Sequence, residues 1–401
     1  MESRPSTPSE ARHVLALASR NKREANELLA GLPLDEQVRL VCEAPLSKRT
    51  AILELTPEPE AVIPLIPEAE LCFTVKATGI SDASWLMEYA TPEQIAACVD
   101  LDVWQGMTPV ARSFESWLAV FAEAGEETLL RSAQILDTEL VVLYLRAAVE
   151  VSLKPNDDES WQPPEGGQTL DGQFYLVPRD PADDIAPLLR LLSVLFRRDY
   201  WLYFRMLQGA IWELESDLGE WALRWRTGRL EELGFPAWDE AMRIYGFVRP
   251  DQRGEIPAAS HPLDIEAWHL PVWMPELPAV GKRQLAIFRA AGELDEGERS
   301  AFFFAFVSMA NKVAIADRMP LGDADTLPAA IEKVAIVASS GLEYVATQNH
   351  LGLPEVLRRA TLERLFRVGA SLDPEAVRPP PLEADIQEDG EQGDGEDPVA
   401  R

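Results

Sequence analysis

The stretch LTPEPEAVIPLIPEAEL, residues Leu55–Leu71, decides whether the N-terminal part of this chain is loop or packed structure. Its four prolines in 17 residues favour a loop, but its isoleucines and leucines are too apolar for a segment surrounded by water. Proline is tolerated at the first position of a helix, where the missing N–H would lack a partner in any case. We therefore predict two short helices, with Pro57 or Pro59 and Pro67 in their first turns. Pro64 is expected to end the first helix early.

The same rhythm extends over residues 34–101. Candidate helix starts recur there at steps of 10 to 13 residues: Leu34, Leu46, Pro57, Pro67, Ile80 and Thr91. This spacing fits a helix of two to three turns and a short connection, so that pairs of helices repeat every ~23 residues. Thr56 and Thr91 precede prolines and can cap the helices that follow. Because helices this short are unstable alone, we expect them to stack and bury a common face.

Longer helices are expected next, at residues 111–124, 126–136 and 138–152. A segment rich in Pro, Gly and Asp follows them, residues 154–180. Within it QFYLV (173–177) is typical of a strand, which can pair with Val149–Leu153 if the preceding helix ends early. A hairpin, an ordered insertion and a boundary between two helical halves are all consistent with this pattern, and the boundary is the simplest interpretation.

In the second half, apolar residues from Tyr200 to Trp225 recur at steps of three and four, which predicts one apolar stripe over about seven helical turns. Four tryptophans in this region predict a thick aromatic core: Trp201, Trp212, Trp221 and Trp225. Further helices are expected at 281–291, 296–318, 327–351 and 354–369. The acidic tail from Pro374 has almost no apolar content, and we expect it to be disordered.

The predicted fold class is all-α. A superhelical N-terminal stack of short helical-hairpin repeats is followed by a bundle of longer helices, with room for one small β-hairpin between them. The expected organisation is a lead-in, a helical-repeat domain, a linker with a short strand, a C-terminal helical domain and an acidic tail: residues 1–10, 11–152, 153–180, 181–371 and 372–401.

The net charge is −30 over 401 residues. The last 29 residues hold ten acidic residues and two arginines, so a charge of −22 remains on residues 1–372 and the folded body is itself acidic. Such a body repels nucleic-acid phosphates and anionic lipids, so we expect neither as a partner. Acidic surfaces suit basic partners or divalent cations, and they also keep a protein soluble.

No segment has the pattern of a membrane span, a secretory signal or a lipidation site. The longest uncharged apolar run, Ser300–Asn311, is shorter than the ~20 residues that a spanning helix needs. The three cysteines, Cys42, Cys72 and Cys98, include no CxxC pair, which argues against a disulfide framework or a zinc site. Cys42 and Cys98 lie on apolar helix faces as small hydrophobic residues. We expect a cytoplasmic protein without membrane insertion.

The repeat region resembles the stacked short helices at the N-terminus of MgtE-type magnesium channels. The shared pattern is a leucine-rich helix followed by L-x-P-E or T-P-E, here LPLDEQVRLVCEA, LELTPEPEAVIPLIPEAEL and YATPEQIAACVDL. The membrane part of those channels has no counterpart, so the resemblance implies only that the acidic repeat senses a cation. The whole chain, with ANKVAIAD (310–317) and SSGLEY (339–344), also resembles a family of soluble bacterial proteins of unknown function.

One constellation could ligate a metal. HPLDIEAWH contains two imidazoles and two carboxylates within nine residues: His261, Asp264, Glu266 and His269. The spacing matches no common metal motif, and Pro262 disfavours a regular helix across it. Structural or solvent-exposed histidines are therefore the favoured interpretation.

A second constellation lies in the apolar helix AFFFAFVSMANKVAIADRM, where Asn311, Lys312 and Asp317 are candidates for a polar pocket. A buried Lys312 could serve as a base or a Schiff-base amine. The favoured alternative is that the asparagine satisfies a neighbouring helix end while the lysine extends to water. Nucleotide-binding and nucleophile motifs are absent from the sequence, and no cofactor is expected.

Arginines concentrate between residues 190 and 229. Seven occur there: Arg190, Arg197, Arg198, Arg205, Arg224, Arg226 and Arg229. With the interleaved tryptophans they could bind phosphate or RNA. We expect them instead to pair with carboxylates near them in sequence, such as Glu213, Glu215, Asp217, Glu231 and Glu232.

The leading functional hypothesis is a cytoplasmic, non-catalytic interaction, scaffold or regulatory protein that binds one or more protein partners. Stacked helices present extended surfaces, and no catalytic constellation is recognisable in the sequence. An enzyme with an unrecognised polar site in the C-terminal bundle is the first alternative. Sensing of a divalent cation, magnesium, by the acidic repeat is the second.

Overall fold

The computed structural model describes residues 9–79, 81–156, 160–180, 184–256 and 285–377. Eight helices and two 3₁₀ turns occupy the first hundred residues: α1 (Ser9–Ala18), α2 (Lys22–Ala30), α3 (Leu34–Glu43), α4 (Leu46–Leu53), α5 (Pro59–Val62), η1 (Ile63–Leu65), α6 (Glu68–Thr78), η2 (Ser81–Ala83), α7 (Ser84–Tyr89) and α8 (Pro92–Asp102). The predicted helical repeat is confirmed.

The next part alternates helices with two small hairpins. Its elements are β1 (Trp104–Gln105), β2 (Thr108–Pro109), α9 (Ala111–Ala124), α10 (Glu126–Ile135), α11 (Thr138–Ala148), β3 (Val149–Leu153), β4 (Phe174–Pro178), α12 (Ala186–Arg198), α13 (Tyr200–Trp212) and α14 (Glu215–Glu232). The strands pair β1 with β2 and β3 with β4, both antiparallel, and the second pair joins Val149 to Pro178 and Leu153 to Phe174. The strand expected near 173–177, and its pairing with 149–153, are confirmed.

The helices stack in two rows. α4, α6, α8, α10 and α12 pack one on the next along one row, and α7, α9, α11 and α13 along the other. Each helix therefore contacts the one two places along the chain, as in helical-repeat proteins. The packing does not change at residue 181, because α12 lies on α9 and α10 and α13 lies on α11. The β3–β4 hairpin is thus an insertion between α11 and α12 that leaves both rows continuous.

The proline-rich stretch that opened the sequence forms α5 and η1, and α6 follows. Pro59 is the first residue of α5, and Pro67 immediately precedes α6. Around Pro64 and Pro67 the backbone is not a regular helix, so carbonyls there lack the N–H partners that a regular helix supplies, although the Ile63 carbonyl keeps the N–H of Ile66. Gln94 on α8 satisfies two of them, because its Nε2 donates to the Ile63 and Ile66 carbonyls at 2.9 and 2.7 Å.

The predicted caps of this region differ in outcome. Thr91 forms a capping box with Gln94, in which each side chain accepts from the other's backbone N–H. The expected cap by Thr56 is wrong: its hydroxyl donates back to the Leu53 carbonyl at 2.6 Å, and no side chain caps α5.

The long stripe predicted from Tyr200 to Trp225 is interrupted. α13 ends at Trp212, and α14 begins at Glu215 in a new direction. The predicted aromatic core is also wrong, since its four tryptophans are 44 to 78% exposed. The buried aliphatic and aromatic side chains of these helices are smaller: Tyr203, Met206, Leu207, Leu218, Ala222 and Leu230.

The remaining elements form a second group of helices. They are α15 (Trp238–Ala241), η3 (Met242–Tyr245), η4 (Pro250–Gln252), α16 (Ala286–Ala291), α17 (Glu296–Ala316), α18 (Thr326–Asn349), α19 (Leu353–Arg359), α20 (Leu362–Leu372) and α21 (Pro374–Val377). α18 packs between α17 and α20, and α16 packs on α18 and α19. Among the described residues no helix is long and apolar enough to cross a bilayer.

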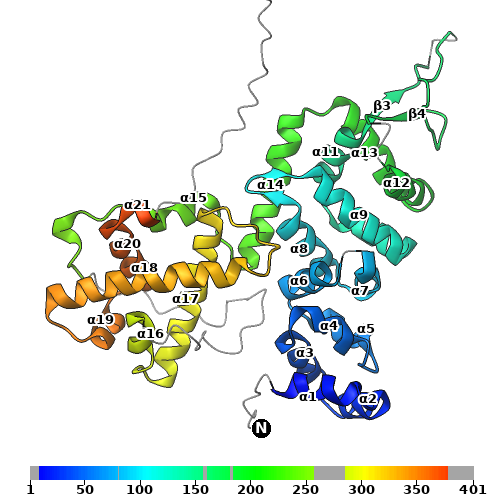
Figure 1. The fold of residues 1–401 in the computed structure, drawn as a ribbon. Helices are drawn as coiled ribbons and strands as arrows, with labels where there is room; N and C mark the ends of the chain where they lie inside the picture. The colour runs from blue at the N-terminus through cyan, green and yellow to red at the C-terminus, as the bar shows by residue number, and fades with distance from the viewer. Residues whose placement is uncertain (1–8, 80, 157–159, 181–183, 257–284, 378–401) are drawn as a thin grey trace, which may run out of the picture.

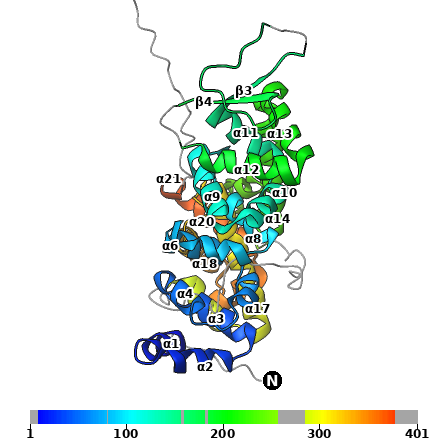
Figure 2. The ribbon, with the colours of Figure 1, turned by 90° about the vertical axis from the view of Figure 1, so that its right-hand side faces the viewer.

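Figure 1 shows the two-row stack as a column, with the N-terminus at one end and the β3–β4 hairpin at the other. The α16–α20 lobe lies beside this column, and α14 runs between the two. In Figure 2, turned by 90°, the lobe lies behind the column. α14 packs on α8 and α11 of the stack, so it is the element that carries the chain from the column to the lobe.

Candidate functional site

A pocket of about 290 Å³ lies where the stack, α14 and the C-terminal lobe meet. The β1–β2 hairpin, α14, α15 and the end of α17 each supply part of its wall. The lining residues are Trp104, Gly106, Met107, Leu223, Arg226, Thr227, Leu230, Pro236, Ala237, Trp238, Asp239, Ala314, Ile315, Arg318, Met319 and Leu321.

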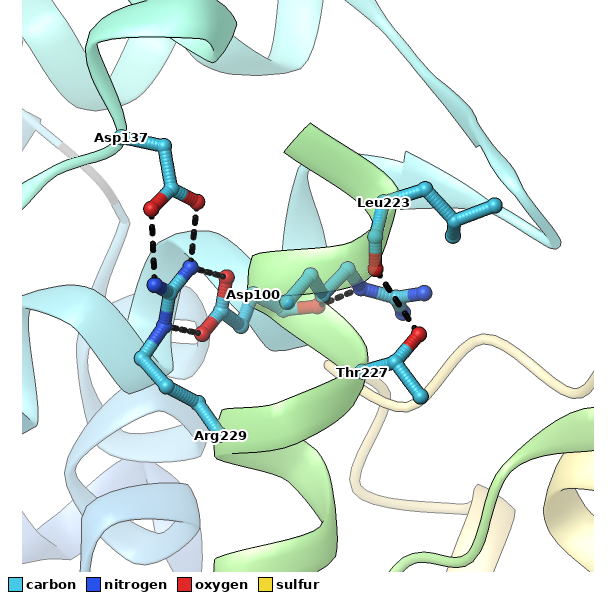
Figure 3. A network of polar contacts seen from close by, with 6 residues as sticks. Asp100, Asp137, Leu223, Thr227 and Arg229 are labelled. Atoms are coloured by element: carbon cyan, nitrogen blue, oxygen red, sulfur yellow. Dashed lines mark hydrogen bonds and ion pairs between the residues drawn. The ribbon is translucent and has the colours of Figure 1, made fainter. Parts of the chain in front are cut away.

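Arg229 fixes α14 against the stack next to this pocket. Its guanidinium lies between two carboxylates, Asp100 of α8 and Asp137 before α11 (Figure 3). The bonds to Asp100 measure 2.6 and 2.9 Å, and those to Asp137 2.8 and 2.6 Å. Such two-pronged pairs are strong and geometrically specific. The Asp100 side chain is 1% exposed, so this contact is internal and positions α14.

Arg226, one turn earlier, lies in the pocket wall and is 7% exposed. Its Nε donates to the Asp100 carbonyl at 2.8 Å and its Nη1 to the Gly106 carbonyl at 3.2 Å. Its guanidinium also lies 4.9 Å from the centre of the Trp104 ring. Within the described chain it forms no ion pair, because both Asp100 oxygens bond to Arg229. Burial lowers the pKa of Arg226 to about 10, so it stays charged near neutral pH.

Arg318 enters the pocket from the end of α17. The helix ends in a Schellman motif, in which the N–H of Arg318 donates to Ile315 and that of Met319 to Ala314. Arg318 takes the left-handed position of this motif, with φ of 53°, where glycine is usual. Its guanidinium lies 5.2 Å from the Trp238 ring centre, and no ion pair joins it to another described residue.

The apolar part of the pocket includes two tryptophans with unused donors. The indole Nε1 atoms of Trp104 and Trp238 are enclosed, and neither finds a hydrogen-bond partner among the described residues. Trp104 is 5% exposed. Met107, Met319 and several leucines complete the wall. The pocket therefore combines a flat aromatic and aliphatic lining with two cations.

A second feature is a group of exposed aromatic residues on α13 and α14. Trp201 is 78% exposed, Trp212 57%, Trp221 44% and Trp225 48%. The Trp221 and Trp225 rings stack with centres 5.9 Å apart, and Arg224 lies 5.1 Å from the Trp221 ring centre. We call Trp221, Arg224 and Trp225 the α14 aromatic cluster.

The candidate residues from the sequence are not gathered at one place. His261, Asp264, Glu266 and His269 lie outside the described residues. Elsewhere along the described chain, no group of three or more His, Cys, Asp and Glu side chains is placed to hold a metal ion. Metal binding and magnesium sensing therefore stay predictions.

The polar-pocket candidates occupy three separate contacts. Asn311 is 2% exposed and donates to the Gly234 carbonyl at 3.0 Å. Lys312 pairs with Glu363 of α20 at 2.8 Å. Asp317 accepts from the Tyr245 hydroxyl at 2.7 Å and from the Lys333 ammonium at 2.6 Å. These contacts join α17 to its neighbours, and none of the three residues lines the pocket described above.

Four of the seven arginines of 190–229 pair with carboxylates of the described residues, but not with the expected ones: Arg197, Arg198, Arg205 and Arg229. Arg197 binds Glu126 at 3.0 Å, and Arg229 binds Asp100 and Asp137. These partner carboxylates lie on or next to the stacked helices that pack against α12 and α14, because a long arginine side chain extends from its own helix to the neighbouring one. Distances along the sequence of 71 to 129 residues separate the partners, so local spacing could not reveal them.

The pocket itself was missed from the sequence because its wall comes from four separate segments. The sequence gives one indication of the pocket: Arg318 and Met319, which line it, directly follow the candidate Asp317 at the end of a long apolar helix. The sequence also shows the four tryptophans of residues 201–225, but their helical spacing predicts a buried position for them.

Comparison with curated proteins and with solved structures gave no match. The sequence profile that does match shows no relation to the N-terminal domain of magnesium channels, so that resemblance stays one of repeat rhythm. The match spans residues 26–375, which includes the stack, α14 and the lobe. The chain belongs to the family of unknown function DUF6178.

Proposed function

We propose that this protein is a non-catalytic interaction protein that binds a protein partner through the exposed aromatic side of α13 and α14. The observation that carries the proposal is the exposure of four tryptophans within 25 residues, Trp201 to Trp225. Tryptophan buries a large area when a partner covers it, and tryptophan and arginine dominate the energetics of protein interfaces.

The α14 aromatic cluster supports this use. Trp221 and Trp225 stand one turn apart and stack on each other, which keeps both rings in place before a partner arrives. Leu214, 65% exposed, immediately precedes α14 and adds another exposed apolar side chain at the start of that helix. Preorganised aromatic residues lose little side-chain entropy on binding.

The charge of the chain indicates the kind of partner. Residues 1–372 carry −22, and acidic side chains precede the cluster on α14: Glu215, Asp217 and Glu220. A partner segment with apolar side chains and flanking lysines or arginines would be attracted to this surface. A second copy of the chain would instead bring two strongly negative bodies together, so we propose a different protein as the partner.

The test compares the full-length protein with a variant in which Trp221 and Trp225 are both replaced by alanine. Proteins captured from lysate of the native source are identified for each, and the strongest candidate is purified and titrated by calorimetry. We expect the variant to lose that partner, with affinity reduced by at least about a hundredfold for two central tryptophans. Affinity for the unmodified protein should fall as salt rises, because the attraction is partly electrostatic.

Phe247→Ala provides the matched control. Phe247 is 62% exposed with Arg253 5.5 Å from its ring centre, so it repeats the aromatic–arginine arrangement away from α13 and α14. Its replacement should leave the partner bound. Equal affinity of the double tryptophan variant and the unmodified protein would refute the proposal, as would self-association through this surface in sedimentation experiments.

A further inference from the structure

The pocket between the stack, α14 and the C-terminal lobe carries an inference that is independent of the proposed protein interface. Three of its features cost free energy in the empty protein, and the two that bring positive charge into the pocket point to one kind of ligand. The features are a buried cation, an arginine at a position that favours glycine, and two unused indole donors.

Arg226 is the first feature. A buried guanidinium is normally paired with a carboxylate, because an unpaired charge loses its hydration without replacement. Here only two backbone carbonyls accept from it, which leaves three of its five N–H groups without a bond to a described residue. Because Arg226 lines the pocket, a bound anion is the partner that the site lacks.

Arg318 is the second feature. Its backbone φ of 53° is one of two positive values found at non-glycine positions in the described chain. Glycine would close the helix at lower cost, so the arginine side chain accounts for the choice. That side chain extends toward the β1–β2 hairpin, since its Cδ lies 3.6 Å from where a Cβ on Gly106 would stand. It thus spans the pocket from the lobe to the stack without an ion pair to any residue that the structure describes.

The walls between the two cations are flat and apolar. Trp104 and Trp238 each lie beneath one guanidinium, at 4.9 and 5.2 Å. Pockets that bind small molecules combine such walls with a few polar groups that fix orientation. A volume of about 290 Å³ is at the small end of the range for such sites.

We propose that this pocket binds a small organic anion: a carboxylate held by Arg226 and Arg318, on a flat apolar body that lies against Trp104 and Trp238. The other charged residue in the wall is Asp239, which is exposed. With two arginines and one aspartate the wall carries a single net positive charge. A singly charged carboxylate matches it better than a phosphate ester with two charges.

The experiment titrates the full-length protein with aromatic carboxylates, benzoate and naphthalene-2-carboxylate, by saturation-transfer NMR and calorimetry. Benzamide and naphthalene-2-carboxamide are the neutral counterparts, and inorganic phosphate is the anion without an apolar body. We expect saturable binding of a carboxylate below about 10 mM, where even a site with a Kd near ~1 mM is mostly occupied. The amides and phosphate should bind at least tenfold more weakly.

Arg318→Met keeps the aliphatic stem and removes the charge, and we expect it to weaken carboxylate binding at least tenfold without loss of the fold. Arg224→Met is the matched control. Arg224 of α14 also lies over an aromatic ring, that of Trp221, but it is outside the pocket. This variant should bind as the unmodified protein does.

Four results would overturn the proposal, and the first three concern the carboxylates. They are no binding of either carboxylate at about 10 mM, equal binding of carboxylate and amide, and unchanged affinity of the Arg318→Met variant. Equal binding of phosphate would also overturn it, since the aromatic walls would then have no part in recognition. The outcome of the tryptophan experiment on α14 has no bearing on any of these results, so the two proposals can fail separately.

Discussion

The crossing of α18 and α20 makes one substitution informative about the whole lobe. Gly341 and Gly369 face each other there, and the helix backbones touch. A Cβ on Gly341 would stand 1.9 Å from the Leu365 carbonyl oxygen and 2.9 Å from the Gly369 nitrogen. Carbon and oxygen atoms without a bond between them approach to about 3.3 Å. Gly341→Ala therefore forces the two helices apart by roughly 1.4 Å.

The cost has two parts of opposite sign. Alanine favours the helical state over glycine by about 1 kcal/mol. Overpacking costs about 1–3 kcal/mol, and a gap of about 1 Å removes up to half of the dispersion energy of each contact across it. Because Leu365, Phe366 and Val368 of α20 are fully buried, many contacts lose this energy. We expect a net loss of about 2 kcal/mol in the free energy of unfolding, the upper overpacking cost of about 3 kcal/mol less the helical gain of about 1 kcal/mol.

Gly228→Ala is the matched control. Gly228 lies in α14, is exposed, and has no atom within 4 Å of the position of an added Cβ. The same exchange should there raise stability by about 0.5–1 kcal/mol, because only the helical preference acts. Urea unfolding followed by circular dichroism measures both variants. A Gly341→Ala midpoint at or above that of the unmodified protein would refute the account of the crossing.

Four other substitutions or measurements test the remaining contacts. Arg229→Met should cost about 3–5 kcal/mol by leaving the buried Asp100 carboxylate unpaired. The loss of stability should be larger near about pH 8 than near about pH 5. Burial without the guanidinium holds the pKa of Asp100 in the folded variant above its unfolded value, so the folded state keeps a proton that the unfolded state releases. The free energy of unfolding of the variant therefore falls as the pH rises between these two values. Urea titrations with equal losses at both pH values would contradict this. Gln94→Leu should cost about 2–4 kcal/mol in the same assay, since the Ile66 carbonyl and the Thr91 N–H lose this partner and the Ile63 carbonyl keeps only the N–H of Ile66. A loss under about 1 kcal/mol would contradict it. Cys42, whose pKa burial raises to about 12, and the other two buried cysteines should react with a thiol reagent only after unfolding; rapid labelling of the native protein would show that a cysteine is accessible. Arg318→Gly should raise the free energy of unfolding by about 1 kcal/mol, because glycine adopts a positive φ without penalty; a lower melting temperature would show that the arginine side chain stabilises the empty protein.

The sequence predicted helices correctly where their starts and ends are marked by residues close to one another in the chain. Helix starts at Leu34 and Leu46, the cap at Thr91 and the helix 111–124 agree with the structure, because proline, capping residues and apolar spacing act over a few residues. The break after Trp212 was missed, since a stripe with steps of three and four continues through it. Periodicity records which residues share a side, but not whether a neighbouring helix covers that side.

The candidate site shows the same limit more strongly. Its residues come from positions as far apart as Trp104 and Leu321, and each has an ordinary local context. Arg226 and Arg229 are three residues apart and look alike in the sequence. Arg229 bonds to two carboxylates, whereas Arg226 bonds to none among the described residues. Only the fold, which places Asp100 and Asp137 around Arg229, separates their roles.

That separation is the physical basis for assigning structure to one arginine and binding to the other. In the Asp100–Arg229–Asp137 contact each charged group is paired directly, which leaves the three groups with a net charge of −1 beside Arg226. Arg226 lies near the Asp100 charge but bonds only to backbone carbonyls among the described residues, and Arg318 adds a second cation in a backbone conformation that glycine would adopt more easily. Local conflicts of this kind in an otherwise consistent fold concentrate at functional sites. Both arginines meet in one pocket lined by two tryptophans, where a bound carboxylate would accept hydrogen bonds from both guanidinium groups.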